Sequence, residues 1–275
     1  MPRDPRAKTL TRYAVDDDDR PIGRILTRRE ILGLLGGSAL VAACAPISAP
    51  TFPSATAGVA TAAPIAAGSA AVTVLPSCVV RPALTEGPYF VDEKLNRSDI
   101  RSDPATNTTK PGIPLALTFL VSRVSGTACA ALASATVDVW HCDALGVYSD
   151  ATDPTFGSTK GTKFLRGYQT TDANGLARFA TIWPGWYQGR AVHVHFKIRT
   201  TAANGQVSDF TSQLFFDETM NDRIFAQAPY SQKGGAGRLR NERDGIFQGS
   251  GGKLTLAPTK TSDGYTATFD IGLAA

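Results

Sequence analysis

Short runs rich in β-branched and aromatic residues follow one another from Pro111 to the end of the chain, separated by turn residues. Asn-Gly pairs lie within residues 172–175 and 202–205, and this dipeptide is favoured in tight β-hairpins. A helical apolar period extends at most a turn or two, near residues 217–227. We therefore predict an all-β fold, an antiparallel sandwich built from the runs 113–124, 135–144, 162–171, 175–183, 190–200, 208–216, 253–258 and 264–273.

The front of the chain predicts export. Arg28 and Arg29 directly precede the apolar stretch Ile31 to Ala43, which is too short to span a bilayer and suits a signal sequence. The paired arginines resemble the twin-arginine export signal. The run VAAC ending at Cys44 resembles a lipobox, although its small residues also fit an ordinary signal-peptidase site. We expect residues 1–44 to be a leader and the protein to be periplasmic or anchored outside the cytoplasm, touching the membrane only through this segment.

Residues 45–77 are nearly all small residues and proline and carry no charge, which predicts a flexible tether before a single domain over 78–275. Without the leader the chain is nearly neutral, so nothing points to nucleic acid. If the lipobox cysteine is lipidated, three cysteines remain. In an oxidising compartment Cys78 and Cys129 are one pairing, which leaves Cys142 free, but the sequence alone does not decide which two pair.

The stretch GRAVHVHFKI holds His193 and His195, two of the three histidines in the chain. In a strand the period of two places both imidazoles on one face, away from Val194 and Phe196. Two neutral imidazoles on one face suit zinc, copper or iron, whereas the alternative is a strand whose solvent face happens to carry histidine. Adding His141 would instead make a three-histidine zinc site. A cupin site is disfavoured, because no glutamate follows the second histidine within a few residues.

Two tyrosines precede the histidine pair. Tyr148 closes the segment VDVWHCDALGVY, and Tyr187 follows TTDANGLARFATIWPG. In order and context these four residues resemble the metal motif of the intradiol ring-cleavage dioxygenases, the catechol and protocatechuate dioxygenase family, and the resemblance covers roughly residues 80–250. It implies a sandwich of the intradiol type in which Tyr148, Tyr187, His193 and His195 bind a non-haem ferric ion, Fe(III).

The chemistry of the donors agrees with that implication. Phenolates are hard anionic ligands that favour Fe(III), and only a strong Lewis acid keeps two tyrosines ionised at neutral pH. The resemblance further implies that both atoms of O2, the co-substrate, enter a small aromatic diol of the catechol type. The ring then opens between its two hydroxylated carbons to a muconate-type diacid. Tyr187 is the tyrosine expected to leave the metal and take a substrate proton.

The resemblance also nominates residues around the metal. Arg190, three residues before the first histidine, matches a family arginine that stabilises negative charge on the substrate, and Gln213 in SQLFF matches a family glutamine. Pro88 and Tyr89 in LTEGPYF match the segment that lines the substrate pocket. Tyr168, in FLRGYQTT, occupies a position where the family usually has an apolar aromatic residue, so we expect it to serve in packing.

The chain departs from the family at its N-terminal part, and one of its motifs has an alternative interpretation. Cytoplasmic catechol dioxygenases carry a long helical dimerisation segment ahead of the sandwich, and here a leader and tether occupy that position, so the sequence predicts no oligomeric state. In addition, the pattern around Tyr187 occurs in transthyretin-like sandwiches that bind no metal, in which the tyrosine is structural. The alternative prediction is therefore a non-enzymatic, transthyretin-like binding module tethered at the cell surface.

Overall fold

The computed structural model describes residues 78–201 and 205–274. The predicted leader, residues 1–44, and the predicted tether, residues 45–77, lie outside the described residues, as does most of the second Asn-Gly turn. Among the helices that are described, none has both the length and the apolar character needed to cross a membrane.

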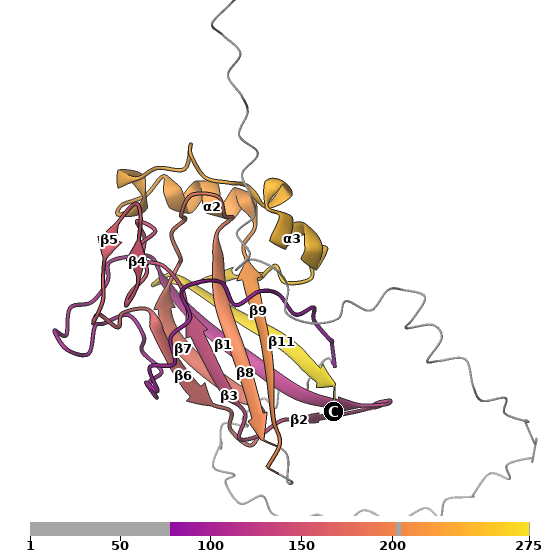
Figure 1. Ribbon diagram of the computed structural model, residues 1–275. Coiled ribbons are helices and arrows are strands. Elements are labelled where there is room, and N and C mark those ends of the chain that lie inside the picture. The colour runs from indigo at the N-terminus through magenta and orange to yellow at the C-terminus, as the bar shows by residue number, and fades with distance from the viewer. Residues whose placement is uncertain (1–77, 202–204, 275) are drawn as a thin grey trace, which may run out of the picture. The chain divides into compact units, whose positions relative to one another are not determined.

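Two β-sheets pack against each other around one core (Figure 1). The first sheet has the strand order β10-β11-β1-β2, with β7 also paired to β1, and the second has the order β6-β3-β8-β9. Strands β4 and β5 form a separate small pair. The strands are β1 (Pro114–Ser125), β2 (Ala128–Ala131), β3 (Thr136–Trp140), β4 (Thr152–Asp153), β5 (Gly157–Ser158), β6 (Arg166–Thr170), β7 (Leu176–Ile182), β8 (His193–Thr201), β9 (Val207–Phe215), β10 (Thr259–Lys260) and β11 (Tyr265–Ala274).

The predicted all-β sandwich is confirmed, with one pair of strands that is not antiparallel. Strands β1 and β11 run parallel, in a register that extends from Leu115 opposite Tyr265 to Val124 opposite Ala274. Parallel neighbours need a long connection between them. Here almost the whole domain separates the two strands along the chain, so β11 can enter beside β1 in either direction.

The first Asn-Gly turn forms but does not make a hairpin. The Asp172 side chain accepts from the backbone N–H groups of Asn174 and Leu176, and Gly175 adopts a positive φ of 75°. A Cβ on Gly175 would lie 2.2 Å from the Val121 carbonyl oxygen. The turn carries the chain from β6 in the second sheet to β7 in the first, because each strand finds its hydrogen-bonded partner in a different sheet. The second turn joins β8 to β9, which do pair antiparallel on either side of it.

The run 253–258 was predicted as a strand, and this prediction is wrong. Leu254 and Leu256 are buried as a strand would bury them, but the segment pairs with β9 at a single bridge, between Thr255 and Phe215. A turn precedes the run and Pro258, which lacks an N–H group, closes it, so no ladder can extend. The strand in this part of the chain is the short β10.

Alternating side chains fill the core between the sheets. Val194 and Phe196 of β8 point into it, as the strand period predicts. Phe119 of β1 lies at the centre, with ring centroids 5.2 Å from Phe196 and 6.0 Å from Phe269 of β11. The residues of β8 that alternate with Val194 and Phe196, including both histidines, therefore face away from the core.

Helices lie beyond one end of the strands (Figure 1). They are α2 (Glu218–Phe225) and α3 (Gly245–Ser250), with the 3-10 turns η2 (Tyr230–Gln232) and η3 (Asn241–Arg243). Helix α2 confirms the helical period near residues 217–227, and its N-cap Asp217 accepts from the Met220 N–H. Helix α3 was not predicted from the sequence. The start of β8 lies at this same end of the sandwich (Figure 1).

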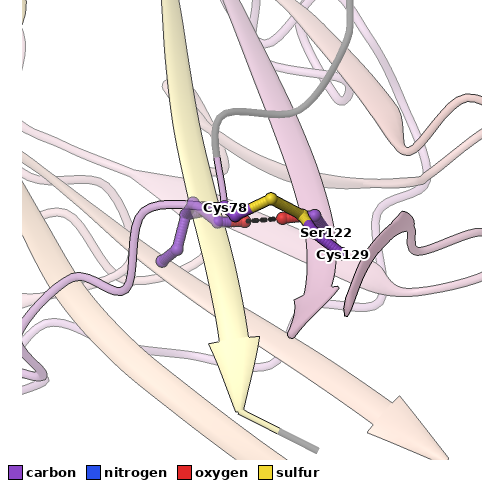
Figure 2. Close-up of a disulfide and its surroundings, with 4 residues drawn as sticks. Cys78, Ser122 and Cys129 are labelled. Carbon is purple, nitrogen blue, oxygen red and sulfur yellow. Dashed lines mark hydrogen bonds between the residues drawn. A yellow bond between two sulfur atoms is a disulfide. The ribbon is translucent and has the colours of Figure 1, made fainter. Parts of the chain in front are cut away.

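Residues 78–113, which we call the entry segment, run along the sandwich with little regular structure. A disulfide between Cys78 and Cys129 of β2 holds its first residue, with Cα atoms 5.8 Å apart (Figure 2). This is the pairing that the sequence left open, and Cys142 is free and buried. Further along, Lys197 pairs with Glu86 and Arg199 with Asp92. The entry segment therefore covers the outward face of β8.

Candidate active site

The two histidines of β8 lie on its outward face and are nevertheless buried. His193 is 2% exposed and His195 is fully buried, so the solvent-facing interpretation of this strand does not hold. Burial lowers the pKa of both imidazoles, with the positive charge of Arg190 acting in the same direction. Both rings are therefore neutral at physiological pH, which is the form that binds a metal.

All four residues of the predicted metal motif come together. The Nε2 atoms of His193 and His195 are 2.9 Å apart, and the Tyr148 hydroxyl lies 3.4 Å from the His193 Nε2. The Tyr187 ring stands nearly perpendicular to the Tyr148 ring at 5.7 Å between centroids, and also 5.7 Å from the His193 ring. Two imidazole nitrogens and a phenol oxygen thus converge on one point with a second phenol ring beside them.

The two tyrosines come from separate loops that are fastened to each other. Tyr148 follows β3, and Tyr187 lies between β7 and β8. The Lys233 ammonium donates to the Leu145 carbonyl at 2.9 Å and to the Trp186 carbonyl at 2.7 Å, one contact in each loop. A lysine from the C-terminal part of the chain therefore links the two loops that carry the phenols.

Each histidine is oriented by its surroundings. The His193 Nδ1–H donates to the Ala191 carbonyl at 2.7 Å, which leaves the Nε2 lone pair directed at the site. The His195 ring stacks on Trp140, with centroids 5.1 Å apart and planes within 6°. On another side, a Cβ on Gly87 would lie 3.1 Å from the His195 Cε1, so the entry segment packs directly on this ring.

Arg190 and Gln213, predicted from separate strands, are also brought together. The Arg190 Nη2 donates to the Gln213 Oε1 at 2.6 Å, and the Gln213 amide donates to the Thr85 carbonyl at 3.0 Å. Both side chains are buried. A third partner was missed by the sequence reasoning: the Asp244 carboxylate accepts from the Arg190 Nε at 3.1 Å. The run RDGIF signals a helix N-cap at Asp244, but no local pattern links it to an arginine so far away in the chain.

The predicted pocket residues differ in their positions. Tyr89 stacks on Tyr148 at 4.4 Å between centroids and lies nearly perpendicular to Tyr187 at 5.9 Å, so it forms a wall of the site. Its hydroxyl donates to Asp153 at 2.6 Å, a contact that the sequence did not predict. Burial, and then this carboxylate, raise the pKa of the Tyr89 phenol. Pro88 is exposed beside Gly87.

Known proteins share this arrangement of residues and strands. A profile of the family described as Dioxygenase matches residues 85–273, which lie within the predicted domain. The structure of an intradiol ring-cleavage dioxygenase from Tetranychus urticae is 33% identical in sequence, covering 72% of this chain and 94% of the other, with a TM-score of 0.60. A second dioxygenase crystal structure gives 33% identity over the same shares, with a TM-score of 0.59.

The chain belongs to the intradiol ring-cleavage dioxygenase family. It is therefore an oxidoreductase, and the alternative of a non-enzymatic binding module is not supported. The resemblance stated from the sequence is confirmed at the level of family and fold.

His141 does not supply a third imidazole to this dioxygenase site. Its Nδ1–H donates to the Cys142 carbonyl at 2.8 Å, and its Nε2 accepts from the Thr181 hydroxyl at 2.7 Å. Both ring nitrogens are therefore engaged. Within the described part of the chain no three side chains among His, Cys, Asp and Glu are grouped to hold a metal. The three-histidine zinc interpretation is thus overturned. Tyr168 is half-buried on β6, opposite Asp138 of β3.

His141 should make the stability of the dioxygenase pH-dependent. Burial lowers its pKa to about 4, whereas the unfolded chain protonates histidine near 6.5. Below pH 6.5 the unfolded state therefore binds a proton that the folded state does not bind, so stability falls as the pH falls from 6.5 to about 4. Titration of this one group lowers the free energy of unfolding by about 2 kcal/mol at pH 5.

Urea unfolding of the wild type and of His141→Gln at pH 7.5 and pH 5 measures this effect. Glutamine keeps a donor and an acceptor but does not titrate. We expect the destabilisation caused by the substitution to be smaller at pH 5 than at pH 7.5, by about 2 kcal/mol. An equal loss at both pH values would show that His141 is not held neutral.

The donors of the site fit a ferric ion better than zinc. Two imidazole nitrogens and the Tyr148 oxygen converge without a carboxylate or thiolate among them, and the second phenol, Tyr187, lies alongside. Two neutral Nε2 acceptors at 2.9 Å repel each other unless a proton or a cation lies between them. Phenol oxygens are hard donors that suit a trivalent ion. His193, His195, Tyr148 and Tyr187 are therefore the residues that would hold it.

Proposed function

We propose that this chain is a ferric-iron-dependent intradiol dioxygenase that inserts both atoms of O2 into a catechol-type diol and opens the ring between its two hydroxylated carbons. The observation that carries the proposal is the convergence of two imidazole nitrogens and a phenol oxygen at one buried point, with a second phenol ring at 5.7 Å. Fe(III) held by these residues would supply a Lewis acid that withdraws electron density from a diol whose two oxygens chelate it.

The two tyrosines are suited to different tasks. Tyr148 is 5% exposed and lies between the Tyr89 ring and the histidines, so it is held firmly as a permanent ligand. Tyr187 is only partly buried and lies in a loop, so the protein encloses it less completely than Tyr148. We assign to Tyr187 the task of accepting a proton from the incoming diol, because a phenolate released from a cation regains its ordinary basicity.

Arg190 supplies the positive charge of the site. The residue is 6% exposed, and Gln213 and Asp244 orient its guanidinium through hydrogen bonds. A buried, fixed cation stabilises negative charge that develops on a substrate far better than a solvated one does. Gln213 acts through Arg190 and also ties the entry segment to β9, because its amide donates to the Thr85 carbonyl. The segment that carries Tyr89 is thereby anchored over the site.

Oxygen uptake by the purified full-length protein tests the proposal. Catechol, protocatechuate and hydroxyquinol form the substrate panel, and iron content is measured on the same preparation. We expect a red-brown protein, coloured by charge transfer from tyrosinate to iron, that consumes one O2 per ring opened. A colourless protein that takes up no ferric iron and consumes no oxygen with any of the three diols would refute the assignment.

We propose in addition that the enzyme works outside the cytoplasm. Arg28, Arg29 and the following apolar stretch support export, and Cys44 supports a lipid anchor. The disulfide between Cys78 and Cys129 agrees with an oxidising compartment. Cell fractionation of the wild type and of a variant with both arginines changed to lysine tests this: retention of both proteins in the same fraction would contradict it.

A further inference from the structure

Asp244 stands at the junction between the C-terminal helix α3 and the active site. It is the N-cap of α3, where its Oδ1 accepts from the Ile246 N–H at 2.8 Å and from the Phe247 N–H at 3.2 Å. Its other oxygen faces the opposite way. The Oδ2 accepts from the Arg190 Nε at 3.1 Å and from the Ala191 N–H at 2.7 Å. With 2% exposure, this carboxylate is almost entirely enclosed by its partners.

One oxygen of Asp244 thus fixes two features of the site. The first is the Arg190 guanidinium, which is held at Nε by Asp244 and at Nη2 by Gln213. An arginine side chain has about 2 kcal/mol of rotamer entropy, and contacts at two edges of its planar group leave it one orientation. The contacts with Asp244 and Gln213 together define that plane.

The second feature is the residue that orients His193. The Ala191 N–H donates to Asp244, while the Ala191 carbonyl accepts from the His193 Nδ1–H at 2.7 Å. A shift of this residue would therefore be passed to the imidazole, whose Nε2 is aimed at the site. The Asp244 carboxylate therefore contacts both Arg190 and the backbone that holds His193.

We propose that Asp244 is a positioning residue of the ring-cleavage reaction, which sets the Arg190 guanidinium and the His193 imidazole through a single carboxylate oxygen. The inference rests on the proposed function for its kinetic consequences, but the geometry it describes does not depend on the substrate. It assigns to the part of the chain around α3, which carries no residue of the metal motif, an indirect part in the reaction through Arg190 and His193.

The test compares two N-cap aspartates in the full-length enzyme. Asp244→Asn keeps an acceptor for the α3 N–H groups but replaces the charged double acceptor that faces Arg190. Asp217→Asn makes the same change at the N-cap of α2, where the exposed side chain accepts only from Met220. Asp244→Ser, with serine as another good N-cap, serves as a second variant should the asparagine variant fail to fold.

For Asp244→Asn we expect kcat to fall about 100-fold while KM for catechol changes by less than about threefold, because positioning acts on the transition state more than on binding. The tyrosinate-to-iron absorption band should shift without loss of iron, since His193 turns. Asp217→Asn should match the wild type in kcat and in its absorption band. A wild-type kcat in Asp244→Asn would overturn the inference. So would a fall in kcat no larger than the fraction of the variant that is unfolded.

Crystal structures of the wild type and Asp244→Asn separate this inference from the proposed function. We expect the Arg190 guanidinium in the variant to leave its wild-type plane, with Nε displaced from residue 244. An unmoved Arg190 would refute the positioning role even if the enzyme cleaves catechols. Conversely, a wild type that consumes no oxygen with any diol would refute the proposed function, and a displaced Arg190 would still support the role of Asp244.

Discussion

A Tyr148→Phe variant is expected to lose much of its colour and at least about 100-fold of its oxygen uptake with catechol. The substitution removes only the hydroxyl that lies 3.4 Å from the His193 Nε2. The phenylalanine ring can keep its packing on Tyr89, so the loop should hold its shape. Loss of a neighbour that merely orients a metal ligand already costs about 10- to 100-fold in affinity or activity, and loss of a ligand costs more.

Tyr168→Phe is the matched control for this experiment. Tyr168 is half-buried on β6 and is not among the residues that converge on the histidines. Iron content, visible absorption and oxygen uptake of both variants are compared with the wild type after urea unfolding has shown that each is folded. A Tyr148→Phe enzyme with full colour and rate would mean that Tyr148 is no ligand, whereas equal losses in both variants would point to general damage.

Breaking the disulfide should cost about 4 kcal/mol of unfolding free energy. Cys78 and Cys129 are 51 residues apart in the sequence. A crosslink of this span removes chain entropy from the unfolded state that corresponds to about 4 kcal/mol in the entropic model. We expect Cys129→Ser, and likewise the wild type in reductant, to unfold at a correspondingly lower urea concentration.

Reductant added to Cys129→Ser is the internal control. It should not shift the urea midpoint further, because Cys142 is free. Under native conditions the folded variant should keep its oxygen uptake within about twofold. The entry segment retains other attachments, since Leu84 donates to Thr211 and Gln213 donates to Thr85. An unchanged urea midpoint would contradict the predicted stabilisation. A loss of activity without loss of stability would show that the crosslink acts on the site.

Local patterns in the sequence predicted the parts of the fold that depend on local physics. The alternation on β8 placed both histidines on one face, and the turn signal at 172–175 marked the end of a strand. Which strand pairs with which depends on burial over the whole chain, so neither the crossing from β6 to β7 nor the parallel β1–β11 pair could be predicted.

At the site, too, local patterns predicted some residues, whereas others depend on contacts between distant segments. The motif residues were found because their order and spacing along the chain resemble a known family, and the structure brings all four together. Asp244, Lys233 and Asp153 reach the site from distant segments, and each makes contacts that only the folded chain creates. An aspartate before a short helix and a lysine in a glycine-rich run carry no signal of their partners.

The position of Cys78 places the start of the described domain far from the catalytic residues. Val80, Arg123 and the end of β8 at Thr201 line one hollow, so the first described residues lie at the end of β8 opposite His193. The nine-residue strand separates these two ends by roughly 26 Å. The disulfide at Cys78 and the catalytic residues therefore occupy opposite poles of the domain, and the chain enters the described domain away from the active site.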